Sequence, residues 1–201
     1  RAFPNNTKLR CRSSTNNEDL EGFNGAGLYN SYTQHLDEGH LIKSMRQVWA
    51  SLWTYRAYEE RHFYRINHFA VYMGVLVHPN YEDEKANGVA VTRNIYDPRF
   101  EGYYVNVQVG EDLVTNPEDE SIPDEFLAWF FRDEMEIQYA RQSNSVVEGE
   151  TVLSDSQIDA LVDALAEAHI HFEQLYDIGE FALDVEFKIT HDDKLVLKQA
   201  R

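Results

Sequence analysis

The sequence has a single cysteine, Cys11, among its 201 residues. One thiol cannot form a disulfide within the chain, so an internal disulfide framework is excluded, which is consistent with a reducing compartment. The sequence also lacks any run of about 18 apolar residues, and it lacks a charged leader followed by an apolar stretch. We therefore expect a cytoplasmic protein without a membrane span, in which Cys11 is a small buried thiol.

Positive charge is scarce as well, because 18 lysines and arginines stand against 35 acidic residues and give a formal net charge of −17. A field of this sign repels nucleic acids and anionic lipids, so neither is an expected partner. A nucleotide binds such a chain only where fixed cations and a divalent metal ion overcome the field locally. The apolar content of 43% suffices for the core of one domain or of two closely packed lobes.

Glycine is concentrated in the segment RSSTNNEDLEGFNGAGLYNS, residues 12–31, which is the first with residues suited to ligand binding. An arginine and two serines precede an acidic pair and three glycines. Because glycine has no Cβ atom, a backbone here can adopt positive φ and approach a ligand closely. Lone glycine motifs have a high false-positive rate, so the segment by itself is compatible with a phosphate loop or with an ordinary surface turn.

Hydrophobic periodicity predicts the elements of the first half. Residues 8–14 alternate as a short strand, with Arg12 on the side away from the core. Between residues 41 and 67 apolar residues recur near helical spacing, which predicts one long helix or two joined helices with the apolar stripe packed in the core. Three apolar runs are typical of strands: residues 69–77, 88–92 and 103–109.

The second half predicts a hairpin over residues 126–131 and 134–139, with a helix from Pro123 as the alternative. Ser154 and Gln157 have capping-box spacing, and the apolar residues that follow at helical intervals predict a helix over residues 155–175. Residues 181–190 alternate strictly, turn at residues 191–193 and return to the end as a hairpin. Antiparallel-looking strands with separate helices indicate an α+β fold.

The C-terminal hairpin combines acidic and basic residues on one face. Asp184 and Glu186 lie opposite the apolar face of the first strand, and two carboxylates at this spacing can hold one or two Mg²⁺ ions. Gln199 and Arg201 have the same spacing on the return strand, so strand pairing brings the four side chains together, where Arg201 can fork phosphate oxygens. By itself the pattern is more typical of the solvated face of a half-exposed sheet.

Four stretches of the sequence are informative together: RSSTNNEDLEGFNGAG, WASLWTYRAYEER, NGVAVTRNIYDP and DVEFKITHDDKLVLKQAR. The first is similar to an Arg-Ser-Ser segment with a glycine-rich phosphate loop, and the second to a helix with Ser-Leu and Arg-Ala pairs. The third is similar to a Gly-Val-x-Phe-Thr strand followed by proline, and the fourth to an Asp-x-Glu-Phe hairpin that ends in Gln-x-Arg. In this they resemble the ATP-binding domain at the N-terminus of phosphoenolpyruvate synthase and pyruvate phosphate dikinase, a family of the ATP-grasp class. The closing hairpin is the most specific of the four.

The resemblance implies an ATP-grasp-like nucleotide-binding domain over residues 1–201, with a mostly antiparallel sheet and packed helices. It implies that Arg12 and Arg201 contact the nucleotide phosphates as catalytic residues. Asp184 and Glu186 are implied to hold Mg²⁺, so that the cofactors are ATP and Mg. Such a site works mainly by positioning and by stabilising charge, since phosphoryl transfer demands little covalent chemistry from the protein.

The remaining implied site residues lie beside these groups. Gln199 is implied to orient the phosphate and metal cluster. The glycine loop is implied to be a lid whose backbone N–H groups face the phosphates; its glycines are Gly22, Gly25 and Gly27.

Two positions depart from the family pattern. Gly74 stands where the hinge strand usually has glutamine, which leaves Met73 and Val75 as weak candidates for adenine contacts. Glu111 follows Gly110 where the family has a Gly-Leu-Gly-Glu segment, so it is either an additional polar or metal-binding residue or a plain loop carboxylate. The turn of the terminal hairpin is also one residue longer.

The family's first subdomain and its phosphohistidine and acceptor domains are not found in this sequence, which begins with Arg1 rather than methionine. We therefore expect a piece of a longer protein that is inactive by itself. None of the eight histidines has the family's Gly-Gly-x-x-x-His setting. His169 and His171 are two apart on the expected helix, a poor geometry for one metal ion, and are interpreted as core or surface histidines.

The function implied by the resemblance is a phosphotransferase that uses Mg-ATP to phosphorylate a histidine on another domain of the longer protein, for transfer to pyruvate or a related acceptor. The alternative is a non-catalytic regulatory module that binds a nucleotide, which the altered hinge at Gly74 favours. A glucan or an antibiotic as acceptor also stays open. A purely structural domain predicts instead that Arg12 and Arg201 lie far from Asp184 and Glu186.

Overall fold

The computed structural model describes residues 3, 7–20, 22–25, 27–34, 40–110, 121–131 and 134–201, to which every structural statement refers. The chain divides into two compact units, Arg1–Asn80 and Tyr81–Arg201, and each is described by itself. Within the described ranges, no helix is both long and apolar enough to cross a membrane.

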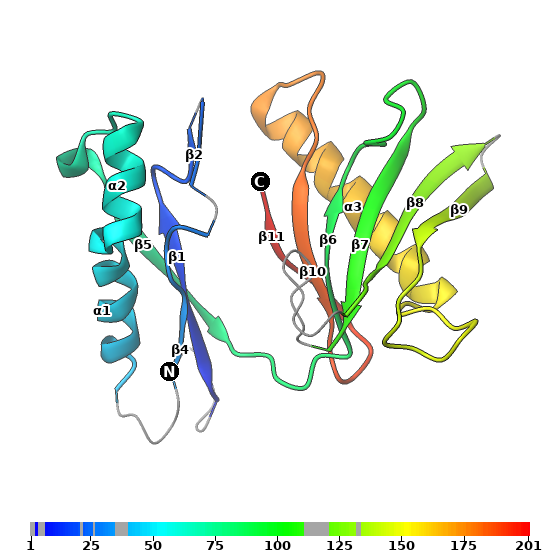
Figure 1. Ribbon diagram of the computed structural model, residues 1–201, viewed down its shortest axis with the longest axis horizontal. Coiled ribbons are helices and arrows are strands. Elements are labelled where there is room, and N and C mark those ends of the chain that lie inside the picture. Colours follow the sequence, from blue (N-terminus) through cyan, green and yellow to red (C-terminus); the bar gives the residue numbers. More distant parts are fainter. Residues whose placement is uncertain are drawn as a thin grey trace. The chain divides into compact units, whose positions relative to one another are not determined.

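The first unit contains a three-stranded antiparallel sheet in the order β4-β1-β5. The central strand β1 (Leu9–Thr15) pairs with β4 (Tyr32–Gln34) on one side and with β5 (Met73–Pro79) on the other. Helices α1 (Ile42–Ala50) and α2 (Tyr55–Phe63) lie along one side of this sheet (Figure 1). Cys11 is fully buried as predicted, and burial raises the pKa of its thiol.

Of the two alternatives predicted, one long helix or two joined helices, the second is what forms, with the 3₁₀ turn η2 (Ser51–Trp53) between the helices. The prediction of one continuous core stripe is wrong. Val48 and Leu52 are buried, but Trp53 and Tyr55 are 56% and 80% exposed. Thr54, whose backbone is extended and whose side chain caps α2, separates the two helices, so Tyr55 begins the second helix with a new rotational phase.

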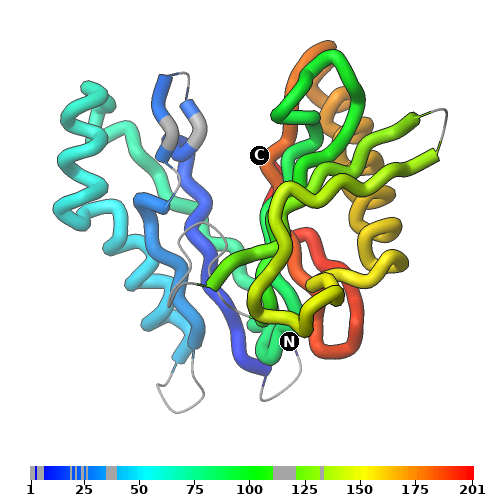
Figure 2. Tube along the Cα trace, turned by 45° about the vertical axis from the view of Figure 1, so that its right-hand side comes forward, coloured from blue at the N-terminus to red at the C-terminus, as the bar shows by residue number. Residues whose placement is uncertain are grey.

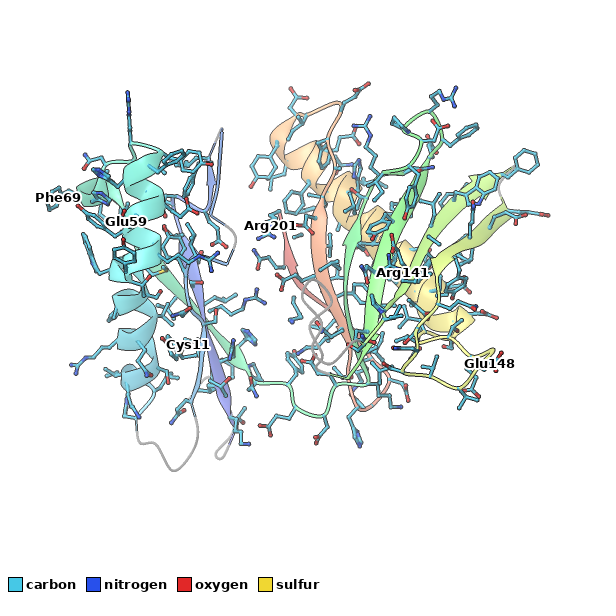
Figure 3. All side chains as sticks on the ribbon, in the orientation of Figure 1. Cys11, Glu59, Phe69, Arg141, Glu148 and Arg201 are labelled. Carbon is cyan, nitrogen blue, oxygen red and sulfur yellow. The ribbon has the colours of Figure 1, made fainter. Side chains whose placement is uncertain are left out.

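The strand predicted over residues 69–77 begins later than expected. A short 3₁₀ turn, η3 (His68–Ala70), comes first, because the Asn67 side chain accepts a hydrogen bond from the Phe69 amide at 3.0 Å. Phe69 is therefore 90% exposed and projects from the unit (Figure 3).

The second unit is built on a six-stranded antiparallel sheet in the order β11-β10-β6-β7-β8-β9. The bounds of its strands are β6 Ala86–Val91, β7 Gly102–Val109, β8 Asp124–Phe131, β9 Glu134–Arg141, β10 Asp184–Ile189 and β11 Leu195–Ala200. The predicted β8–β9 hairpin is confirmed, and the helical alternative from Pro123 is not what forms. The α+β class with mostly antiparallel sheets is confirmed.

Helix α3 (Asp155–Tyr176) covers one face of the six-stranded sheet (Figure 1). Its predicted capping box is present, because the Ser154 hydroxyl accepts from the Gln157 amide and the Gln157 side chain accepts from the Ser154 amide. The core of the unit lies between α3 and the sheet, with Phe126, Leu161 and Phe187 among its fully buried side chains. Within the described residues of the second unit, no helix packs on the opposite face of this sheet.

Candidate functional site

Strand β10 sorts its side chains by chemistry onto the two faces of the sheet. Val185, Phe187 and Ile189 are buried in the core beneath α3. By alternation, Asp184 and Glu186 project from the opposite face, and both are half-buried. The carboxylate pair predicted from the sequence therefore lies on the face that α3 leaves open.

The return strand β11 brings Arg201 to Asp184. Backbone hydrogen bonds join the two residues in both directions, at 2.8 and 3.1 Å. The Arg201 guanidinium donates from Nε at 3.2 Å and from a terminal nitrogen at 3.0 Å to the same oxygen, Oδ2 of Asp184. The second carboxylate oxygen, Oδ1, takes no part in this ion pair. Figure 3 labels Arg201, which directly follows the last residue of β11.

Gln199 pairs with Glu186 in the register of β10 and β11, and a bulge follows at Phe187. The hairpin thus places Glu186 opposite Gln199 and Asp184 beside Arg201, as the predicted strand pairing requires. The structural alternative concerns Arg12 as well as Arg201, and the position of Arg12 relative to these carboxylates stays a prediction.

Lys188 is a cation on the same face that the sequence reasoning missed. Its side chain is 5% exposed, forms an ion pair with Glu84, and lies 4.1 Å from the centroid of the Tyr81 ring. Its position two residues after Glu186, in the same alternation, was the available signal. Burial of this ion pair holds in place the part of β10 that follows the two carboxylates.

The start of β10 is held by a hydrogen-bond network that the sequence reasoning also missed. The Thr92 hydroxyl accepts from the Leu183 amide at 2.8 Å and lies 2.8 Å from Nδ1 of His169 on α3. The His169 ring also stacks on Phe181 at 4.2 Å. His169 is thus a partly buried structural histidine, in keeping with its interpretation from the sequence, and its partners position the residue that precedes Asp184.

The open face offers oxygen donors suited to a hard cation. Asp184 and Glu186 supply carboxylates, and Asn106 on β7 stands in the same cross-strand row as Glu186. Oδ1 of Asn106 is buried and has no hydrogen-bond partner. Carboxylate oxygens are ligands that Mg²⁺ prefers, so Asp184 and Glu186 fit the ion implied by the resemblance, whereas Asn106 lies two strands away, beyond β6. Among the described residues, no group of three or more histidine, cysteine and acidic side chains gathers around one point.

In the first unit, Arg12 lies on β1 opposite Leu76 of β5, and its neighbour Cys11 is buried on the helix side. Arg10 shares the face of Arg12 and donates to the Thr33 hydroxyl at 2.8 Å. Burial, and then the charge of Arg12, lower the pKa of Arg10. Two arginines are therefore close together on this strand, and Arg10 is a second candidate for anion binding that the sequence reasoning passed over.

The glycine segment forms a small hairpin and the turns that follow it. Strands β2 (Asp19–Leu20) and β3 (Phe23–Asn24) pair across a tight turn that includes Gly22, at φ 76°. Gly27 has φ 71°, so both positions favour glycine. A Cβ atom on Gly25 would lie 3.0 Å from the Glu18 Cα atom. Each glycine thus meets a backbone requirement of this loop, and its role toward phosphates stays a prediction.

The hinge strand is the beginning of β5. Met73 packs against the core of the first unit, while Gly74 is exposed and pairs with Ser14. Val75 is half-buried on the same side as Met73. The contacts predicted for adenine therefore remain a prediction, and Glu111 lies outside the described residues.

The mixed α+β fold with antiparallel sheets is consistent with an ATP-grasp-like nucleotide-binding domain. A family comparison gives the more specific assignment: residues 1–201 match the model of the pyruvate phosphate dikinase AMP/ATP-binding domain. The chain belongs to this family.

Curated relatives agree with the assignment. The chain is 31% identical to the phosphoenolpyruvate synthase of Pyrococcus furiosus over 121 residues, which are 59% of the chain and 14% of that protein. It is 28% identical to the uncharacterized phosphotransferase YvkC of Bacillus subtilis over 210 aligned residues, which cover 96% of the chain and 24% of that protein. The chain therefore spans about a quarter or less of the length of these relatives.

Proposed function

We propose that the chain is the ATP-binding part of a dikinase-like phosphotransferase, which uses Mg-ATP to phosphorylate a histidine on another domain for transfer to pyruvate or a related acceptor. Membership in a family of AMP/ATP-binding domains supports the nucleotide. The single observation on which the chemistry rests is the arrangement of Asp184, Glu186, Gln199 and Arg201 on the open face of the terminal hairpin.

Each residue has a role that follows from its chemistry. Asp184 and Glu186 hold Mg²⁺, which neutralises charge on the phosphate oxygens when bound. Arg201 stabilises a carboxylate in the absence of substrate, and its guanidinium carries N–H donors in a planar fork, the geometry that suits phosphate. Gln199, opposite Glu186, orients the phosphate and metal cluster. Arg12 and the glycine loop bind phosphates from the first unit.

Transfer to a histidine is tested with ATP labelled at the β or the γ phosphate, incubated with Mg²⁺ and the full-length protein to which this chain belongs. We expect protein-bound label that is stable to base and labile to acid, as phosphohistidine is. Arg201→Ala should reduce the rate of labelling by roughly 10²–10³-fold, the effect of removing one donor that stabilises transition-state charge. Asp163→Asn, an exposed change on α3, should label like the unaltered protein.

The alternative is a regulatory module that binds the nucleotide without transferring a phosphoryl group. The exposed Gly74 in the hinge strand favours this alternative. Such a module would bind ATP but yield neither protein-bound label nor released phosphate. That outcome would refute the transferase proposal and retain the nucleotide-binding one.

A further inference from the structure

The second unit contains an aromatic pocket apart from the β10 carboxylates. Its cavity measures about 510 Å³, within the range of roughly 300–1,000 Å³ typical of small-molecule sites. Strands β8 and β9 form one wall, and the β6–β7 connection forms the other. Figure 2 shows this connection, in green, at the same end of the sheet as the C-terminal end of β8. Strands β6 and β7 separate the pocket from β10.

Aromatic rings dominate the pocket lining. Trp129 and Phe131 project from β8 on the face opposite α3, and their rings lie 6.1 Å apart. Tyr96 and Phe100 face them from the β6–β7 connection, and Leu127 completes the apolar surface. Aromatic faces are electron-rich, so a wall of this kind attracts cations as well as apolar groups.

The β6–β7 connection is fixed in place by its own hydrogen bonds. The Asn94 side chain accepts from the Tyr96 and Asp97 amides at 3.0 and 2.9 Å. The Tyr96 hydroxyl donates to Glu125 on β8 at 2.6 Å, which ties the connection to the sheet. The pocket is therefore formed before any ligand arrives, as small-molecule sites usually are.

Three carboxylates lie in or beside the pocket, and two nearby arginines, Arg99 and Arg141, are paired with Asp97 and Glu125. Asp97 lines the pocket, and Glu136 on β9 stands directly across from Trp129 on the same face of the sheet. Glu134 has the same relation to Phe131. None of the described residues that line the cavity is a lysine or an arginine. Aromatic rings rimmed by carboxylates are complementary to a positive group attached to an apolar body.

The protein itself places one such group at the rim. The Arg99 guanidinium binds both oxygens of Asp97, at 2.8 and 2.6 Å, and lies 5.9 Å from the centroid of the Phe100 ring. Its side chain is 82% exposed, and an exposed ion pair contributes only about 0–1 kcal/mol, so an incoming cation can displace it.

We propose that this pocket binds a small organic cation, an ammonium or guanidinium group attached to an apolar body. The pocket is distinct from the proposed Mg-ATP residues, so the inference does not depend on ATP binding and is tested without nucleotide.

The test uses phenylguanidine, its neutral isostere phenylurea, the anion phenylacetate, and adenosine. Each is titrated into the protein while the indole N–H of Trp129 and the backbone amides of residues 96–100 are followed by NMR. We expect saturable shifts with phenylguanidine and affinity about 2- to 30-fold higher than for phenylurea, the ratio that corresponds to a cation–π contribution of about 0.5–2 kcal/mol. Phenylacetate should cause no shift.

Two variants identify the groups responsible. Trp129→Leu should abolish the shifts of residues 96–100, and Asp97→Asn should bring the affinity for phenylguanidine toward that for phenylurea. Asp163→Asn on α3 removes the same charge on the helix that covers the other face, and should leave both affinities unchanged. The Asp97 variant keeps the test valid if loss of Trp129 disturbs folding.

Three outcomes would overturn the proposal. Equal affinities for phenylguanidine and phenylurea would leave only an apolar pocket. Absence of any shift at Trp129 would exclude a site. Tighter binding of adenosine than of phenylguanidine at the same residues would assign the pocket to a nucleotide base instead.

Discussion

At the scale of single residues, Asp184 and Arg201 form an ion pair whose position matters more than its strength. The Asp184 side chain is 46% exposed and that of Arg201 is 24% exposed. An ion pair this open to solvent adds only about 0–1 kcal/mol to stability. Both arginine contacts fall on one carboxylate oxygen, so the other oxygen stays outside the pair. The arrangement therefore suits a carboxylate that binds a metal ion next to an arginine.

Arg61 is a residue whose environment the sequence does not reveal. It is fully buried, and its guanidinium donates to the Tyr29 hydroxyl, the Leu52 carbonyl oxygen and Nδ1 of His68. The helical stripe predicts apolar residues in the core, and one arginine among several charged residues of α2 gives no local sign of burial. Only tertiary packing distinguishes Arg61 from exposed Arg56.

Tyr96 supplies a prediction of pH dependence. Its hydrogen bond to Glu125, with a smaller effect of burial, raises its pKa from 10.0 to about 12. Because the folded-state pKa is the higher one, the stabilisation is complete below about pH 10 and is lost as the pH rises to about 12. The measurement is the absorbance of tyrosinate as the pH is raised, compared between the protein and Tyr96→Phe. We expect the difference between the two titrations to appear near pH 12, the upper end of this range.

Glu125→Gln is the matched variant for this titration, because it removes the charge and keeps the size of the side chain. The midpoint for Tyr96 should then move down toward 10, the ordinary value. A difference titration already centred at 10 in the unaltered protein would contradict the assigned hydrogen bond.

At the scale of elements, the strands whose residues alternate strictly could be predicted from the sequence, and the other elements could be predicted less well. The hairpin of β10 and β11 and the capped helix α3 follow from local patterns, since alternation and a capping box are signals within a few residues. Residues 69 and 70 were predicted to be part of a strand because they are apolar. They form a 3₁₀ turn instead, because the Asn67 side chain accepts a hydrogen bond from the Phe69 amide. Lys188 was overlooked because its partner, Glu84, is 104 residues away along the chain.

Strand β6 supplies a prediction about packing. Gly88 lies between β10 and β7, and a Cβ atom there would come within 2.6 Å of the Phe187 ring and 2.7 Å of the Asn106 carbonyl oxygen. Gly88→Ala should therefore lower the free energy of unfolding by about 1–3 kcal/mol through overpacking. The measurement is the midpoint of urea unfolding.

Gly179→Ala is the control for this change, because a Cβ atom at that position meets nothing within 4 Å. It should shift the free energy of unfolding by no more than about 0.5 kcal/mol. Equal midpoints for the two variants would show that Phe187 does not pack over Gly88 as the structure indicates.

At the scale of the whole molecule, the net charge of −17 makes the few clustered cations conspicuous. Arg10 and Arg12 share one face of β1 in the first unit, and Arg201 lies beside Asp184 in the second. Composition predicted that a bound nucleotide requires such local cations and a metal ion. Family membership over all 201 residues gives the AMP/ATP-binding class. Which residues act together on one nucleotide depends on long-range packing, and the joint role of Arg12 and Arg201 stays a prediction.

The dependence of ATP affinity on Mg²⁺ and on the two β10 carboxylates tests the central claim most directly. Isothermal titration compares the full-length protein with its Asp184→Asn/Glu186→Gln variant, in Mg²⁺ and in a chelator. The control variant, Asp159→Asn/Asp163→Asn, removes the same charge from exposed positions on α3.

We expect the β10 variant to bind Mg-ATP at least about 10-fold more weakly, the loss of one charged interaction of about 1.5 kcal/mol or more. In chelator it should bind ATP as well as or better than the unaltered protein, because two carboxylates no longer repel the phosphates. The α3 control should match the unaltered protein in Mg²⁺. Equal Mg-ATP affinities for the β10 variant and the unaltered protein would contradict a metal-binding role for Asp184 and Glu186.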